Sequence, residues 1–160
     1  MAFRRVVDAT APQLYRLAAR LMGDAREAED VLQESYCRAF EALTHARFEG
    51  RSSLMTWLYR IVSNAALDAL RSRARNQRPA ENGGLDNVVS LPSVDGHLAL
   101  RELSEWIADL RSEQRTALVL KELEGLTAAE VGQVMQCSEG AVEQHLVRAR
   151  AILRARRQDG

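Results

Sequence analysis

The fold class of this chain is decided by residues 126–150, which read LTAAEVGQVMQCSEGAVEQHLVRAR. Thr127 and Glu130 have the spacing of a capping box, in which each side chain accepts a hydrogen bond from a backbone N–H at the start of a helix. The following apolar residues recur at helical spacing as far as Met135. We therefore predict a short helix that begins after Thr127.

A second helix is predicted directly after this one. Gln136 and Cys137 form the turn, and Ser138 is a good N-cap for a helix from Glu139 to about Arg154. Four apolar side chains can close the small core between the two helices: Val131, Val134, Val142 and Leu146.

Two short helices joined by a tight turn are typical of a helix-turn-helix motif, whose second helix enters the major groove of DNA. The exposed residues near the start of that helix are Glu139, Glu143, Gln144 and Arg148. A Gln side chain can form paired hydrogen bonds with adenine, and an Arg side chain can bind guanine or phosphate. A Glu side chain can accept a hydrogen bond from the cytosine amino group but repels phosphates. A basic stripe follows, formed by Arg148, Arg150, Arg154, Arg156 and Arg157. A plain helical hairpin with a solvated charged face remains the alternative.

The N-terminal part of the chain is also helical in pattern. Residues 11–43 predict two helices, separated at Met22-Gly23-Asp24 and with Asp24 as the cap of the second. A third helix is predicted over residues 54–73. Its buried stripe is expected to contain Leu54, Trp57, Leu58, Ile61, Ala65 and Leu70.

Between these blocks, residues 75–94 lack periodicity and contain Pro79, Asn82-Gly83-Gly84 and Leu91-Pro92-Ser93. Helical pattern resumes afterwards with two apolar faces, formed by Leu98, Leu100, Leu103, Trp106, Ile107 and Leu110, and by Ala117, Leu118, Leu120 and Leu123. The sequence therefore predicts an all-α protein of two small helical domains: residues 1–75 and 98–160, joined by a flexible linker over residues 76–97.

Composition limits the function further. The net charge is zero, yet residues 1–79 carry 13 Lys and Arg against 9 Asp and Glu. Nearly all positively charged residues are arginine, which either a GC-rich genome or selection for phosphate binding would explain.

Cys37 and Cys137 lie far apart, so we expect neither a zinc site nor a disulfide scaffold. No signal-peptide pattern or membrane-spanning apolar run is present, so a cytoplasmic protein without membrane insertion is expected.

One face of the third helix carries a second candidate site, formed by Arg60, Asn64, Asp68 and Arg71. Their spacings of four, four and three residues place them together, away from the Trp57 and Ile61 stripe. With the aromatic Tyr59 nearby, such a face could contact extruded bases and the phosphate backbone. An ordinary solvated face with an internal Asp68–Arg71 pair remains the alternative.

Three stretches in this order resemble the extracytoplasmic-function (group 4) sigma factors of bacteria. Residues 28–36 (AEDVLQESY) are similar to the polymerase-binding segment of that family. Residues 48–53 (FEGRSS) and 56–61 (TWLYRI), with Asn64 and residues 68–71, are similar to its promoter −10 segment. Residues 126–153 resemble its −35 reading domain.

The resemblance implies a sigma region 2-like helical bundle, a sigma region 4-like helix-turn-helix domain and a role for each candidate residue. Core RNA polymerase would be a partner through its beta-prime and beta subunits, and Asp30, Gln33 and Glu34 would face the coiled coil of beta-prime. The −10 element would be bound by Phe48, Gly50, Ser52, Arg60, Asn64 and Arg71. The −35 element would be bound by Ser138, Glu139, Glu143, Gln144, Arg148 and Arg150. Trapping an unpaired base offsets part of the cost of unstacking it. The family also implies an anti-sigma factor as partner.

This chain differs from the family pattern at three positions of the second domain. Glu143 stands where Lys or Arg is frequent, Gln136 replaces a frequent turn glycine, and Gly132 replaces a frequent alanine. Glycine lowers helix propensity by about 1 kcal/mol relative to alanine.

The resemblance implies a binding protein rather than an enzyme. The sequence shows no nucleophile–base pair, metal-ligand cluster or glycine-rich phosphate loop. We therefore expect neither a cofactor nor a metal. The acidic residues of the second helix scatter around it, which argues against a metal site. Two other hypotheses remain. A sigma-like mimic would titrate an anti-sigma factor without productive DNA binding, and a phosphodiester-processing enzyme would need clustered carboxylates and a divalent metal.

Overall fold

The computed structural model describes residues 2–45, 53–76 and 105–159, and every regular element within these ranges is a helix. In chain order they are α1 (Ala2–Met22), α2 (Ala25–Thr44), α3 (Leu54–Arg75), α5 (Ser112–Leu118), the π-helical η2 (Val119–Leu123), α6 (Ala128–Met135) and α7 (Glu139–Asp159). The predicted all-α class is confirmed. The predictions for Phe48, Gly50 and Ser52, and for the linker beyond Asn76, lie outside the described residues.

The break between α1 and α2 forms as predicted. Gly23 has φ +74°, a left-handed conformation that glycine adopts without steric cost. The Asp24 Oδ1 atom then accepts a hydrogen bond from the backbone N–H of Arg26 at 2.8 Å, which caps α2. These two residues stop one helix and start the next, so α1 and α2 fold back against each other.

The first helix begins much earlier than the predicted residue 11, because it continues through Pro12 to Ala2. A proline inside a helix removes one backbone hydrogen bond and usually ends the helix. Here tertiary packing compensates. The Phe3 ring lies edge-on against Tyr36 and Phe40, with ring centroids 6.2 and 5.1 Å apart.

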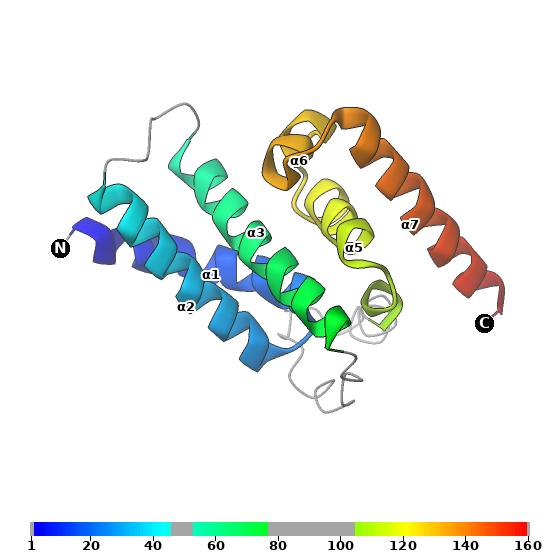
Figure 1. Ribbon diagram of the computed structural model, residues 1–160, viewed down its shortest axis with the longest axis horizontal. Helices are drawn as coiled ribbons and strands as arrows, with labels where there is room; N and C mark the ends of the chain where they lie inside the picture. The colour runs from blue at the N-terminus through cyan, green and yellow to red at the C-terminus, as the bar shows by residue number, and fades with distance from the viewer. Residues whose placement is uncertain (1, 46–52, 77–104, 160) are drawn as a thin grey trace.

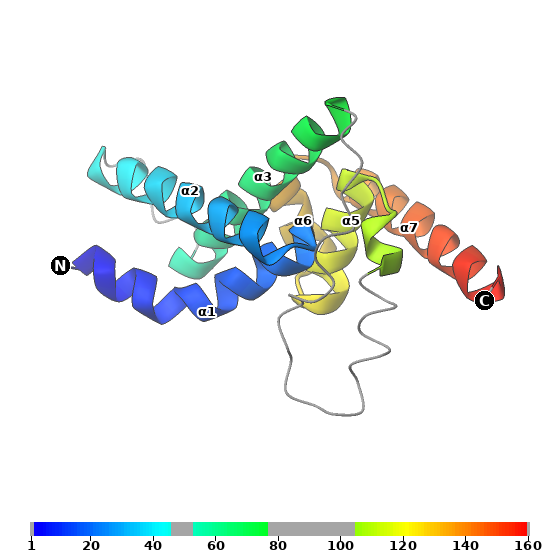
Figure 2. The same cartoon turned by 90° about the horizontal axis from the view of Figure 1, so that it is seen from below.

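Helix α3 lies at the centre of the molecule, between α1 and α2 on one side and α5 and α6 on the other (Figures 1 and 2). It is therefore buried on more than one face, and the predicted single stripe is partly wrong. Leu58, Ala65 and Leu70 are buried as expected. The residues Leu54, Trp57 and Ile61 are only half-buried, whereas the buried set also contains Tyr59, Val62, Ser63, Ala66 and Leu67.

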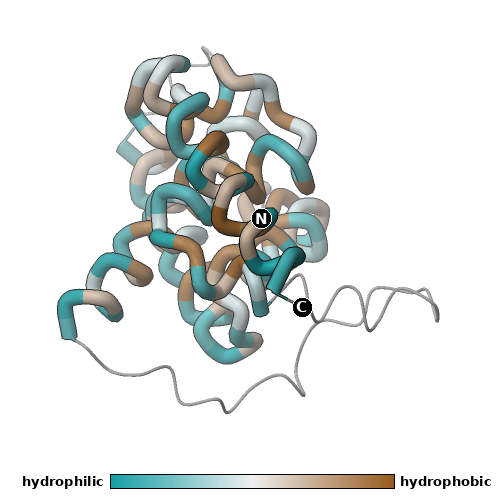
Figure 3. Tube along the Cα trace, turned by 90° about the vertical axis from the view of Figure 1, so that its right-hand side faces the viewer, coloured by the Kyte–Doolittle hydropathy of each residue, from teal (hydrophilic) through white to brown (hydrophobic). Residues whose placement is uncertain are grey.

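The second half of the molecule contains the predicted helix-turn-helix. Thr127 and Glu130 form the capping box at the start of α6, with both hydrogen bonds at 3.1 Å. The Ser138 Oγ atom accepts from the Ala141 N–H at 3.1 Å at the start of α7. All four predicted core residues, Val131, Val134, Val142 and Leu146, are buried. Hydrophobic and hydrophilic residues alternate along the helices, as expected for helices with one buried and one exposed side (Figure 3).

The turn between α6 and α7 explains Gly132. A Cβ atom there would stand 2.7 Å from the backbone oxygen of Cys137, closer than side chains ordinarily approach. Gly132 has a low helix propensity, as the sequence analysis stated, and the structure adds that the turn leaves no room for alanine at this position. The turn itself requires a left-handed residue, and Gln136 adopts φ 58° there.

The predicted face containing Leu123 is also partly wrong, because the chain widens into a π-helix over Val119–Leu123. The Glu124 N–H bonds to the Val119 carbonyl at 3.0 Å, a separation of five residues. This wider turn changes the register. Leu123 is 39% exposed, while the Glu124 side chain is only 7% exposed.

Candidate functional site

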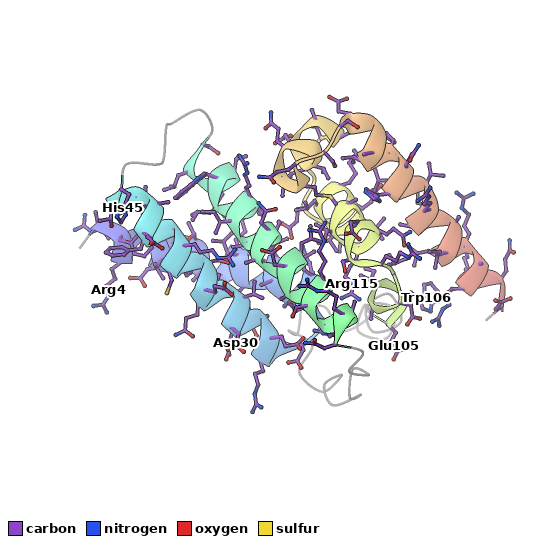
Figure 4. The ribbon with its side chains drawn as sticks, in the orientation of Figure 1. Arg4, Asp30, His45, Glu105, Trp106 and Arg115 are labelled. Carbon is purple, nitrogen blue, oxygen red and sulfur yellow. The ribbon has the colours of Figure 1, made fainter. Side chains whose placement is uncertain are left out.

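The predicted polymerase-binding residues lie together on the outside of α2. Asp30, Gln33 and Glu34 are all exposed and share one helix face. Asp30 projects from α2 on the part of the molecule that lies across α3 from α7 (Figure 4). The Glu34 Oε1 atom is 2.5 Å from the Arg38 Nη2 atom within the same helix.

This face continues into an apolar hollow of about 390 Å³, which is lined by Phe3, Val7, Gln33, Tyr36, Cys37 and Phe40. Phe40 is 54% exposed and is the most exposed large aromatic side chain among the described residues. Gln33 belongs to both surfaces, so the acidic face of α2 and the apolar hollow lie next to each other. Such a combination suits a partner that offers both basic and apolar side chains.

The candidate face of α3 is only partly as predicted. Arg60 and Arg71 are exposed and Asn64 is half-buried. Arg71 does not pair with Asp68. Its Nε and Nη2 atoms each lie 3.0 Å from the Oε1 atom of Glu113, the second residue of α5. Asp68 instead lies 3.8 Å from Arg38 of α2.

Glu113 is held in its ionised form by these contacts. Partial burial alone would raise its pKa, but the hydrogen bond from its own backbone N–H and the Arg71 guanidinium outweigh that effect. The pKa of Glu113 therefore lies below its ordinary value, and the Arg71–Glu113 pair is charged at neutral pH.

Tyr59 does not contribute to this exposed face, contrary to the prediction. It is 8% exposed and belongs to the core. Its hydroxyl is hydrogen-bonded to Gln13 of α1 and donates to the Glu124 Oε2 atom at 3.1 Å. Burial and the adjacent Glu124 carboxylate raise the pKa of Tyr59 to about 12, so the hydroxyl stays protonated and can donate.

The start of α7 presents most of the predicted DNA-reading side chains to solvent. The exposed residues are Ser138, Glu139, Glu143, Gln144 and Arg148. Arg150 differs, because its Nη2 atom lies 2.5 Å from the Glu122 Oε1 atom of η2. Arg156 is likewise paired, with Asp109. Two members of the predicted basic stripe are thus engaged within the protein.

Three residues that the sequence analysis did not select connect the two halves of the molecule. Glu124 accepts from Arg20 of α1 at 2.7 Å and from Tyr59 of α3. Arg115 is 6% exposed, and its guanidinium donates to three carbonyl oxygens: those of Leu21, Ile107 and Ala108. No local pattern in the sequence predicts the π-helical turn that places Glu124 inward, and Arg115 lies in a polar stretch, residues 111–116, that gives no signal of its buried position.

Several other features of the described residues limit the chemistry. None of the helices in these ranges is long and apolar enough to cross a membrane. Within the same ranges, no group of three or more His, Cys, Asp or Glu side chains could hold a metal ion. Both cysteines are free thiols.

Comparison with known proteins gives a consistent result for both halves. The family Sigma-70 region 2 matches residues 6–76, and Sigma-70, region 4 matches residues 100–153. The RNA polymerase sigma-H factor of Pseudomonas aeruginosa is 34% identical over 153 residues, which cover 86% of this chain and 76% of that protein.

Two further proteins match over most of their lengths. The ECF RNA polymerase sigma factor SigW of Bacillus subtilis is 28% identical over 170 residues, covering 99% of this chain and 90% of SigW. The fold is similar to the sigma factor RpoE of Bartonella quintana, solved in complex with the anti-sigma factor NepR. That match has a TM-score of 0.73 at 25% identity and covers 96% of this chain and 95% of RpoE.

Proposed function

Because the chain belongs to the sigma-70 family of RNA polymerase sigma factors, we propose that it is an extracytoplasmic-function (group 4) sigma factor, which binds core RNA polymerase in the cytoplasm and directs it to promoters. We assign polymerase and −10 binding to residues 1–75, and −35 binding to residues 98–160. The observation that carries the proposal is the capped helix-turn-helix with a solvent-facing second helix, in a chain whose other half matches sigma region 2.

The α2 face formed by Asp30, Gln33 and Glu34 is the proposed contact with the beta-prime coiled coil. Its carboxylates complement a basic partner surface, and the neighbouring hollow at Phe40 can accept an apolar side chain. We expect Asp30→Ala to weaken binding of core polymerase by about tenfold, the effect of one interfacial charge-assisted contact. Glu105→Ala is the matched control, because Glu105 is also an exposed acidic residue but lies on the far side of the molecule from α2 (Figure 4).

The −10 element would be bound by α3 through Arg60, Asn64 and Arg71, together with Phe48, Gly50 and Ser52. Arginine and asparagine side chains can follow a single strand by contacting its phosphates and base edges. Strand opening at this element would need no ATP hydrolysis, because the energy of binding an unpaired base can offset the few kcal/mol that unstacking it costs.

The −35 element would be read by the first turns of α7. Arg148 is exposed, whereas Arg150 is already paired with Glu122. We therefore expect Arg148→Ala to weaken DNA binding more than Arg150→Ala and to lower the slope of log K against log salt by about one. An equal effect of the two substitutions would contradict this assignment.

An anti-sigma factor is the proposed regulatory partner. The support is the similarity in fold to RpoE of Bartonella quintana, which was solved with an anti-sigma factor bound. A protein of this kind would hold the chain inactive by covering its polymerase-binding faces.

The decisive experiment uses the purified full chain and core RNA polymerase. Start sites mapped from cells that overproduce the chain define candidate promoters, and transcription from these promoters is then reconstituted in vitro. We expect a transcript that begins at the mapped site and requires both the chain and core enzyme. No transcript despite binding to core enzyme would overturn the proposal, and a chain that binds only an anti-sigma factor would be a titrating mimic.

A further inference from the structure

The exposed surface at the start of α7 is formed by two pairs of side chains, each pair spaced one helical turn apart. Glu143 and Val147 form one pair, and Gln144 and Arg148 form the other. All four side chains are exposed. The opposite side of α7 packs on α5 and α6, so these four residues face away from the described helices (Figure 1).

The Glu143 carboxylate has no partner within the fold. In the parts of the chain that the structure describes, neither a hydrogen bond nor an ion pair is formed by this side chain. Other carboxylates of the same half are paired with arginines: Asp109, Glu113, Glu122 and Glu124. Glu143 therefore takes no part in the ion pairs that stabilise the described fold.

Helix stability does not explain Glu143 either. Glu139 is the first residue of α7, where the helix dipole favours a negative charge. Glu143 lies one turn further on, where that effect has faded, and at a spacing of four residues the two carboxylates repel each other. The fold itself thus gives no reason for a carboxylate at this position.

The base edges in the major groove differ in whether they can bind a carboxylate. An ionised carboxylate only accepts hydrogen bonds, so it needs a donor on the base. Guanine presents two acceptors, and thymine presents an acceptor and a methyl group. Adenine presents a donor beside an acceptor, whereas cytosine presents its amino donor alone. Cytosine is therefore the base that a glutamate in the groove favours, and guanine is the base that it disfavours most.

Glu143 lies where the motif brings side chains to base edges. In a helix-turn-helix, residues near the start of the second helix contact the bases. The neighbouring Val147 is 58% exposed, and apolar side chains in the groove can contact the thymine methyl group. Arg148, which is unpaired among the described residues, can bind a phosphate and offset the repulsion between Glu143 and the DNA backbone.

We propose that Glu143 is a specificity-determining residue, which accepts a hydrogen bond from the amino group of one cytosine in the −35 element and selects against guanine at that position. This inference rests on the proposed function, of which it specifies one base. The selection is partly repulsive, because at guanine or thymine the carboxylate meets acceptors without a donor.

The test uses holoenzyme assembled from the full chain and core RNA polymerase. Its DNA is a promoter identified by mapping start sites in cells that overproduce the chain, with the −35 element randomised. Sequencing the DNA that the holoenzyme retains gives the base preference at each position. Glu143→Ala removes the acceptor, and Glu143→Gln replaces the carboxylate with an amide that can bind adenine through a donor and an acceptor.

Asp159→Asn is the matched control. It removes one negative charge from an exposed position on the same helix, but about 24 Å further along the helix axis. A general effect of charge on DNA binding would therefore appear in this variant too, whereas a contact with one base would not.

For the unmodified chain and for Asp159→Asn, we expect one position at which cytosine is retained about tenfold more often than guanine, which corresponds to about 1.4 kcal/mol. Glu143→Ala should lower that ratio to about threefold or less, and Glu143→Gln should shift the preference at the same position to adenine. Preferences at the other positions should stay the same. A change confined to one position also excludes unfolding of α7, which would abolish every preference.

Three results would overturn the inference: no position that selects cytosine, a cytosine preference that Glu143→Ala leaves unchanged, or equally tighter binding of all sequences by Glu143→Ala. The last result would show that Glu143 only repels phosphates. If holoenzyme with the unmodified chain selects no sequence and starts no transcript, the proposed function fails as well. A defined start site with a selected −35 element that does not depend on Glu143 overturns this inference alone.

Discussion

Replacing Gly132 with alanine tests whether the tertiary structure reverses a preference that is visible in the sequence. Helix propensity alone predicts that Gly132→Ala stabilises the protein by up to about 1 kcal/mol. In the folded chain the new Cβ atom would stand 2.7 Å from the Cys137 backbone oxygen. That oxygen belongs to the turn between α6 and α7, so it cannot swing away as a flexible side chain could.

The size of the effect follows from what must move. The Cys137 N–H donates to the Gly132 carbonyl at 2.9 Å, so a shift of Cys137 strains the bond that closes the turn. Forcing an extra carbon into a packed site costs about 1–3 kcal/mol, which exceeds the gain in propensity. We expect a net destabilisation of up to about 2 kcal/mol, or a fall in Tm of up to about 4–8 °C for a chain of this size.

Gly140→Ala is the matched control for this measurement. Gly140 lies in the first turn of α7, and a Cβ atom there would meet only the Ser138 Oγ atom at 3.8 Å, an ordinary contact. We expect Gly140→Ala to stabilise the protein by about 0.5–1 kcal/mol. Urea unfolding followed by circular dichroism measures both changes. If Gly132→Ala also raised the unfolding midpoint, the steric account of the turn would be wrong.

Three further predictions concern stability. Gln136→Gly should stabilise the protein by about 1 kcal/mol, because Gln136 holds φ 58° at the end of α6 and glycine adopts that conformation without cost; a lower urea midpoint would contradict this. Ser63→Ala should also stabilise by about 1 kcal/mol, since the buried Ser63 Oγ atom has no hydrogen-bond partner among the described residues; thermal unfolding checks it, and a loss of stability would imply that the hydroxyl is satisfied. The third concerns pH: the folded pKa of Tyr59 is about 12 against about 10 when unfolded, so its contribution is complete below pH 10 and is lost as the pH rises towards 12. Between pH 9 and 11 the free energy of unfolding should fall by about 1.4 kcal/mol more than in Tyr59→Phe, and parallel pH profiles for the two proteins would refute the assignment.

Local sequence signals were sufficient for the elements whose ends depend on nearby hydrogen bonds. The Gly23-Asp24 break, the Thr127–Glu130 capping box and the Ser138 cap all form where they were predicted, because each involves residues within three positions of one another. The small core between α6 and α7 was equally readable, since its apolar residues recur with the helical period.

The limits of helices and the width of buried faces depended on packing between segments. Helix α1 passes through Pro12 because Phe3 packs on α2, and α3 is buried on several faces because it lies between the two halves. Periodicity within one helix reports only that one side is apolar. It does not report how many neighbours the helix has.

For function, the order of motifs in the sequence indicated the family, and helical periodicity indicated the all-α class and which residues of α2 and α7 would face solvent. Only the tertiary structure decided which charges are paired across the molecule. The π-helix turns Glu124 inward to Arg20 and Tyr59, and Arg71 meets Glu113 forty-two residues later in the chain. Charge pairing depends on distances of a few ångströms between segments that are remote in sequence, and no spacing along one segment contains that information.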